Sequence, residues 1–249
     1  MTTLHDLLSG PDARCRKVPP YGHVALVDCM PRLVPEGRTA EVAIVSAARV
    51  SLDRGVADVE RDTKLVRYLM RNHHNTPLEH VRFTFEIKAP IFVARQIMRH
   101  RTASFNELSL RYTEIGEEHE CFIPTELRSN SESNRQASGP ITDYETITEV
   151  DLVLYETTCL LDQVRENYHR MIALGMAREQ ARYCLPVGTY TRFYMTIDLH
   201  NLLHFLELRL DRKHAQAETA EYAEAIAILI APIVPIVMQA FFQLHCELV

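Results

Sequence analysis

The amino-acid sequence predicts an α+β fold, in which a single domain over residues 1–249 holds an antiparallel sheet flanked by helices, with long helices at the C-terminal end. Two observations lead to this prediction. The predicted strands and helices follow one another without the regular strand–helix–strand alternation that is typical of parallel sheets. The 249 residues, 47% of them hydrophobic, suffice to bury one sizeable core, and the composition is that of an ordinary globular protein.

Two helices and a strand are predicted in the first part of the chain. Residues 39–51 are expected to form a short helix, and residues 59–72 carry apolar side chains at helical spacing. Residues 82–89 alternate between apolar and polar side chains, with Phe83 and Phe85 on the same side. This alternation predicts a strand with one buried face.

The next segment is expected to contain a helix and a second alternating strand. Pro90 suits the first position of a helix over residues 90–101. Residues 107–112 alternate again, so that Ser109 and Arg111 are expected on one strand face.

The second half of the chain is mainly helical. The polar residues 128–142 are expected to form a surface loop or a mobile insertion. Gly175 supplies a stop for a long helix over residues 143–174, and Asp198 is placed to cap a helix that reaches Leu210. The remaining predicted elements are a short helix that ends before Pro186, a strand over residues 189–197, and an apolar helical stretch from Ala215 that Pro232 and Pro235 interrupt.

Composition indicates in which compartment the protein is located and which classes of partner it lacks. The formal net charge of -6 argues against a nucleic-acid scaffold. No apolar run approaches the roughly 20 residues that span a bilayer, and the N-terminus lacks the pattern of a secretory signal. The six cysteines are scattered without a C-x-x-C pair, so we expect neither a cysteine-built zinc site nor a disulfide framework. We therefore expect a cytoplasmic protein with no membrane or nucleic-acid partner.

The densest polar cluster spans residues 99–112 and reads RHRTASFNELSLRY. One interpretation is structural, because basic side chains at a helix C-terminus complement its dipole by about 0.3–1 kcal/mol each. The other interpretation is binding, since Gln96 and Arg99 share a helical face and Ser109 and Arg111 are expected to share a strand face. Such a convergence of donors suits a phosphate and a uracil edge, because a guanidinium binds phosphate oxygens in pairs.

The extended pattern RHRxxSxNExSxRY in this cluster resembles the signature of the flavin-dependent thymidylate synthases. Further segments resemble the same family in the same order along the chain. They are AARVS at 47–51, HNTPLEH at 74–80, FTFEIKAPIFVARQ at 83–96, REQARYCLP at 178–186 and DLHNLLHFLELR at 198–209. The resemblance covers nearly the whole chain except residues 128–142 and both ends.

The resemblance implies an enzyme that converts dUMP to dTMP, with methylenetetrahydrofolate as carbon donor and NADPH as reductant through FAD. It also implies a homotetramer whose subunits enclose FAD and dUMP between them. Arg209 matches the catalytic arginine that favours ionisation of the uracil N3, and a cation beside a developing anion lowers its cost. The positions implied for dUMP are Gln96, Arg99, Glu107, Leu108, Ser109, Leu110, Arg111, Arg182 and Arg209. Those implied for FAD are His74, Thr76, Arg99, His100, Arg101, Glu107, Asp198, His200, His204 and His214.

Some of these residues have a second interpretation. Residues 76–79 form a capping box with Pro77 at the first helical position, which can coexist with a cofactor contact. His200 and His204 lie one turn apart, which is metal-ligand spacing, but no H-E-x-x-H pattern accompanies them and no metal site is predicted. Ser109 has no neighbouring general base, so we expect it to contact phosphate rather than to act as a nucleophile.

The chain has eight glycines and neither a G-x-G-x-x-G motif nor a P-loop. The diphosphate of a bound FAD must therefore be neutralised by side chains and helix ends. Two rival functions stay open at this point: a catalytically silent protein that binds flavin or nucleotide, and a nucleic-acid-binding module that uses the R-H-R segment. The acidic net charge disfavours the second.

Overall fold

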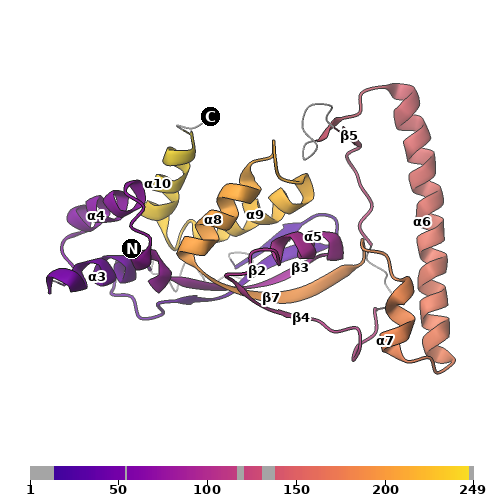
Figure 1. Ribbon diagram of the computed structural model, residues 1–249, viewed down its shortest axis with the longest axis horizontal. Helices are drawn as coiled ribbons and strands as arrows, with labels where there is room; N and C mark the ends of the chain where they lie inside the picture. Colours follow the sequence, from indigo (N-terminus) through magenta and orange to yellow (C-terminus); the bar gives the residue numbers. More distant parts are fainter. Residues whose placement is uncertain (1–13, 54, 117–120, 131–137, 247–249) are drawn as a thin grey trace.

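The computed structural model describes residues 14–53, 55–116, 121–130 and 138–246. Its centre is a five-stranded antiparallel sheet in the order β1-β2-β3-β7-β4. The strands are β1 (Cys15–Val18), β2 (Gly22–Met30), β3 (Arg82–Pro90), β4 (Ser104–Glu107) and β7 (Tyr190–Asp198). Helices flank this sheet (Figure 1), so the predicted α+β class with an antiparallel sheet is confirmed.

Alternation along β3 and β7 gives the sheet one buried face. Phe83 and Phe85 are fully buried, and they pair in register with Ile197 and Met195 of β7, which are buried as well. The side chains between them point to the opposite face and are more exposed. Both strands predicted in these regions are confirmed, each within one residue of its expected ends.

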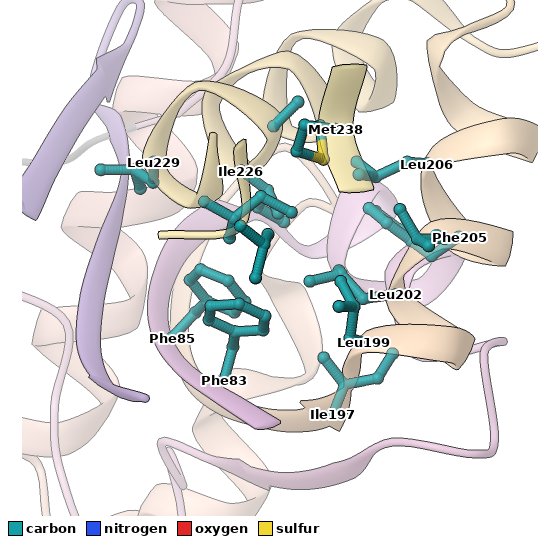
Figure 2. Close-up of a cluster of buried hydrophobic side chains, with 14 of the residues drawn as sticks. Phe83, Phe85, Ile197, Leu199, Leu202, Phe205, Leu206, Ile226, Leu229 and Met238 are labelled. Atoms are coloured by element: carbon teal, nitrogen blue, oxygen red, sulfur yellow. The ribbon is translucent and has the colours of Figure 1, made fainter. Parts of the chain in front are cut away.

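Helices from the second half of the chain cover the buried face of the sheet together with the short helix after β3 (Figure 1). They are α5 (Ile91–Ile97), α8 (Leu199–Leu210), α9 (Ala217–Ile230) and α10 (Pro235–Cys246). Figure 2 shows Phe83 and Phe85 facing Leu202 of α8 and Ile226 of α9, with Met238 of α10 above them. Burial of each such side chain stabilises the fold by about 1.5–3 kcal/mol.

Two further helices lie at the end of the molecule that holds α10 (Figure 1). They are α3 (Val42–Arg49), which continues into the 3-10 helix η1 (Val50–Leu52), and α4 (Val59–Arg71). The carboxylate of Asp58 caps α4 by accepting a hydrogen bond from the N–H of Arg61 at 2.9 Å. Both predicted helices are confirmed. The predicted capping box is wrong, because the 3-10 helix η2 (Thr76–His80) begins after Asn75 and no side chain caps it.

The longest helix, α6 (Tyr144–Ala173), stands apart from the sheet (Figure 1). Asp143 caps it by accepting a hydrogen bond from the N–H of Thr146 at 2.8 Å, and Gly175 ends it with a φ of +88°, a conformation that glycine adopts without strain. The predicted long helix and its stop are therefore confirmed. The short helices α7 (Arg178–Ala181) and η3 (Arg182–Cys184) pack against α6.

The segment between β3 and β4 corrects two predictions. The predicted helix over residues 90–101 ends at Ile97, and Pro90 belongs to β3 rather than to the first turn of the helix. The predicted strand over residues 107–112 is wrong: β4 occupies Ser104–Glu107, and the chain then turns. The carbonyl of Ser109 accepts the N–H groups of the residues three and four positions later at 3.0 and 3.2 Å, which closes a turn that an extended strand cannot contain.

The remaining differences concern the ends of the sheet and the polar loop. No element was predicted for the region of β1 and β2. The chain flanking the centre of the polar loop forms the paired strands β5 (Arg128–Asn130) and β6 (Ser138–Pro140), while residues 131–137 of the expected mobile insertion lie outside the described residues. The predicted interruption of the C-terminal helices is confirmed, since Pro232 lies between α9 and α10. None of the helices in the described parts of the chain is long and apolar enough to cross a membrane.

Candidate active site

The R-H-R segment lies in the turn that joins α5 to β4. Arg99 and Arg101 are exposed. His100 is half-buried, and its ring packs edge-to-face on Phe205, with the ring centroids 4.8 Å apart. The Nε2 atom of His100 accepts a hydrogen bond from Nε of Arg209 at 3.2 Å. A residue of the predicted FAD set and the predicted catalytic arginine therefore contact each other directly.

The charge states of this pair are set by burial. Burial disfavours the charged imidazole of His100, and the neighbouring Arg209 and His204 disfavour it further, so its pKa falls to about 4. Burial also lowers the pKa of Arg209, but a guanidinium stays protonated in proteins. At neutral pH the pair consists of a charged donor and an uncharged acceptor.

A cleft of about 700 Å³ lies between η2 and α8. His200, Asn201 and His204 of α8 line it on one side, and His73 and Asn75, which precede η2, line it on the other. Its volume falls within the range of roughly 300–1,000 Å³ that is typical of small-molecule sites. Imidazole and amide groups and the carboxylate of Glu207 line the cleft together with apolar side chains, which suits a ligand with both aromatic and polar parts.

Three further residues predicted for FAD belong to the same part of the fold. Asp198 is buried, and its carboxylate accepts the backbone N–H and the side-chain amide of Asn201 at 3.0 and 2.7 Å. It caps α8, as the sequence predicts. His74 is exposed and packs its ring edge-to-face on Tyr68, with the centroids 5.7 Å apart, and Thr76 is the first residue of η2.

A second group of predicted residues surrounds α7 and the turn after β4. The Nε atom of Arg111 lies 3.5 Å from the carboxylate of Glu179. The Nε–H of Arg182 donates to the backbone carbonyl of Glu179 at 3.3 Å. The hydroxyl oxygen of Ser109 accepts the N–H of Arg111 at 3.3 Å. Two exposed guanidinium groups beside a hydroxyl form a donor set that suits a phosphate.

Hydrogen bonds to neighbouring elements hold Gln96 and Glu107 in place. The Gln96 amide oxygen accepts the hydroxyl of the fully buried Thr219 at 3.0 Å, and its amide nitrogen donates to Gln216 at the start of α9. The carboxylate of Glu107 accepts the hydroxyl of Thr191 at 2.7 Å. The orientations of both predicted side chains are therefore determined by α9 and β7.

The other predicted positions lie outside these two groups. His214 follows α8, and its Nδ1 lies 2.5 Å from a carboxylate oxygen of Asp211. Leu108 and Leu110 line a separate cavity of about 330 Å³ together with Tyr190. In the part of the chain that the structure describes, no group of three or more His, Cys, Asp or Glu residues is arranged to hold a metal ion.

The two groups of predicted residues do not meet within one chain. The helix α8, which carries Arg209, covers the sheet, whereas α7 lies against α6 at the other end of the molecule (Figure 1). The guanidinium groups of Arg111 and Arg182 both contact Glu179, at the start of α7, whereas the guanidinium group of Arg209 contacts His100. A single chain therefore brings together the residues around α8 and, separately, those around α7.

Comparison with known proteins identifies the family. The family model described as thymidylate synthase complementing protein (Thy1) matches residues 32–236. A flavin-dependent thymidylate synthase of Dictyostelium discoideum is 43% identical over 246 residues, which cover 98% of this chain and 78% of that protein. A flavin-dependent thymidylate synthase of Thermus thermophilus is 45% identical over 204 residues, which cover 80% of this chain and 70% of that protein. The chain belongs to the flavin-dependent thymidylate synthase family.

A solved structure agrees with this assignment. The UMP/dUMP methylase PolB from Streptomyces cacaoi, in its crystal structure bound with 5-Br dUMP, is 34% identical to this chain and superposes with a TM-score of 0.75. The match covers 89% of this chain and 95% of PolB. The two proteins therefore share the fold that surrounds both groups of residues.

The donors around the η2–α8 cleft fit the flavin of a flavin-dependent thymidylate synthase. The cleft offers imidazole and amide groups on both walls, with Leu78 and Leu203 between them. The chain lacks a glycine-rich phosphate loop, so a dinucleotide needs side-chain cations. Arg99 and Arg101 are exposed and make no ion pair within the described residues, although neither lines this cleft. The chemistry of the residues present is therefore compatible with FAD.

Four residues around the site were not predicted from the sequence. His73 and Asn75 line the cleft next to the predicted His74, and Thr219 and Gln216 hold Gln96. The segment HNTPLEH at residues 74–80 could have pointed to Asn75, which is its second residue. The roles of Thr219 and Gln216 have no local signal, because they arise from the packing of α9 against α5.

Proposed function

We propose that this chain is an FAD-dependent thymidylate synthase that reductively methylates dUMP to dTMP, with methylenetetrahydrofolate as the carbon donor and NADPH as the reductant. Family membership and the names of the curated relatives support this activity, as does the resemblance to a UMP/dUMP methylase. The observation that carries the proposal is the half-buried Arg209, held by a neutral imidazole within the same helix-covered region as the η2–α8 cleft.

The proposed roles of the residues follow from their charge and position. A uracil that loses its N3 proton becomes an anion, and the guanidinium of Arg209 lowers the cost of that charge. Arg111, Arg182 and Ser109 bind the phosphate of dUMP, because paired guanidinium donors match its oxygens. A bound flavin supplies the redox chemistry, while the protein supplies orientation and electrostatics.

We further propose that the active enzyme is a homotetramer with FAD and dUMP bound between subunits. This proposal is supported by the separation of the two residue groups in one chain. It is also supported by α6, where Leu152, Tyr155 and Leu160 are 60%, 69% and 59% exposed. Large apolar side chains gathered on an exposed helix are typical of protein interfaces.

A cytoplasmic location is proposed from the cysteines. The five described cysteines, Cys15, Cys29, Cys121, Cys159 and Cys184, are all free thiols. Unpaired thiols of this kind are typical of reducing compartments.

The test of the proposed function is formation of dTMP by the purified holoenzyme supplied with dUMP, methylenetetrahydrofolate and NADPH. We expect Arg209→Ala to lower kcat by about 100- to 1,000-fold, because it removes a cation aimed at developing charge. Flavin content and circular dichroism of this variant should stay unchanged. The matched control is Arg61→Ala, since Arg61 is an exposed arginine on α4 and its removal should leave kcat within twofold of the wild type.

The outcome that would contradict the proposal is a yellow protein that oxidises NADPH without forming dTMP. That result would favour a catalytically silent flavoprotein. Normal turnover by Arg209→Ala, with dTMP formed, would preserve the activity but refute the role of Arg209.

A further inference from the structure

We propose that His100 is a positioning residue for Arg209: it orients the guanidinium toward the uracil without neutralising its charge. The inference rests on the proposed function and adds a role to it. The resemblance to the family implies that His100 contacts FAD, whereas the contacts on this chain point to a second role that acts through the catalytic arginine.

Of the nitrogens in the guanidinium of Arg209, one is held by His100 and two are left for a ligand. The Nε–H of Arg209 donates to Nε2 of His100 at 3.2 Å. Among the described residues, Arg209 has no other hydrogen bond or ion pair. Its two terminal nitrogens therefore keep their donors for a ligand. Since the five donors of a planar guanidinium keep fixed angles to one another, holding the Nε–H restricts the directions of the other four.

The imidazole itself is held by packing. Its ring meets Phe205 edge-to-face at 80°, and Phe205 is fully buried within α8. A ring that is half-buried against a rigid neighbour cannot swing away from Arg209 without losing this contact. Phe205 and Arg209 lie four residues apart on α8, so they share a helical face, and His100 from the preceding turn bridges them.

A neutral acceptor has an advantage that a carboxylate lacks. An Asp or Glu at this position would orient Arg209 equally well, but its negative charge would offset the positive charge that the uracil anion needs. A neutral imidazole accepts the hydrogen bond while the full cation stays available. Burial and the neighbouring Arg209 and His204 keep the pKa of His100 near 4, so the ring remains an acceptor throughout the neutral range.

The experiment compares His100→Gln with His100→Asn, two neutral amides that differ by one methylene. The Gln side chain reaches the position of the imidazole Nε2, whereas the Asn side chain does not. We expect His100→Asn to lower kcat by about 10- to 100-fold, because a misplaced catalytic group loses that much. We expect His100→Gln to stay within about fivefold of the wild type. KM for dUMP should change little in either variant, and kcat is expressed per bound flavin, so that a weakened FAD contact of His100 is not counted as lost turnover.

A double-mutant cycle with Arg209→Ala completes the test. If His100 acts through Arg209, His100→Asn should have no further effect on kcat once Arg209 is alanine. Additive losses, or a loss of flavin that accounts for the loss of activity in His100→Asn, would overturn the inference. Equal kcat values for the two amide variants would overturn it as well. Each of these results is distinct from failure of the proposed function, which would appear as a wild-type holoenzyme that oxidises NADPH without forming dTMP.

Discussion

His100 can accept a hydrogen bond from Arg209 only while its Nε2 carries no proton. An imidazolium has no free lone pair, so protonation would break the bond and place two cations side by side. The fold opposes that protonation by burying the ring beside Arg209 and near His204. Burial of this ring therefore makes the stability of the folded protein depend on pH.

We predict that the free energy of unfolding becomes smaller as the pH is lowered, because His100 takes up a proton more readily in the unfolded chain. Its folded pKa of about 4 lies below the ordinary value of 6.5, so between these values the unfolded chain binds a proton that the folded chain does not. The stabilisation is complete above the ordinary value and is lost as the pH falls through 4. Urea denaturation at pH 7 and pH 5 should show a larger loss for the wild type than for His100→Gln, which does not titrate. Solvent screening keeps the difference small because the ring is half-exposed, and equal losses would contradict the prediction.

At the scale of the element, α8 depends on its N-terminal cap. Asp198 is buried and accepts two hydrogen bonds from Asn201. We predict that Asp198→Ala lowers the free energy of unfolding by about 1–2 kcal/mol, because the cap is lost. Asp198→Asn keeps an acceptor and should cost less than half as much. Urea denaturation measures both variants, and the two would be equally destabilised if the charge rather than the cap mattered.

The same experiment separates two roles of Asp198. The resemblance to the family implies an FAD contact, whereas the structure gives its carboxylate a structural use in α8. Flavin titration of Asp198→Asn therefore serves as the matched measurement. A variant that is as stable as the wild type but binds flavin weakly would assign Asp198 a cofactor contact in addition to the cap.

Helices with local signals were predictable, and strands that depend on pairing were less so. Asp143 and Gly175 mark the ends of α6 through their own chemistry, so sequence alone located that helix. The alternation at residues 107–112 looked like the alternation in β3, but the carbonyl of Ser109 closes a turn there. Whether an alternating segment pairs depends on the neighbouring strand, and the pairing of β4 with β7 stops where Glu107 lies opposite Phe193.

The candidate site follows the same division. The site residues are predicted from the R-H-R segment and from the resemblance of further segments to the family, and their roles stay predictions. Their partners were not readable: Thr219 meets Gln96 across 123 positions of the chain, and Arg209 meets His100 across 109. Such contacts depend on how α8 and α9 pack over the sheet.

At the scale of the whole molecule, the fold holds two incomplete donor sets. Arg209 and the η2–α8 cleft lie with the helices that cover the sheet, and Arg111 and Arg182 lie beside α7 (Figure 1). A closed symmetric assembly repeats each set in every subunit. It can therefore place the α7 set of one subunit against the α8 set of another and complete several identical sites at once.

We predict that two inactive variants restore each other's activity when their subunits mix. Arg209→Ala lacks the α8 arginine and Arg111→Ala lacks the α7 arginine, so each variant by itself should form dTMP at less than about one hundredth of the wild-type rate. If each site takes one arginine from each of two subunits, random mixing leaves about a quarter of the sites with both. The mixture, produced by co-expression of differently tagged chains, should therefore recover about a quarter of the wild-type kcat. Mixing two tagged forms of Arg209→Ala is the control and should recover nothing. If mixed tetramers form but stay inactive, both arginines must come from one chain, and the shared site would be refuted.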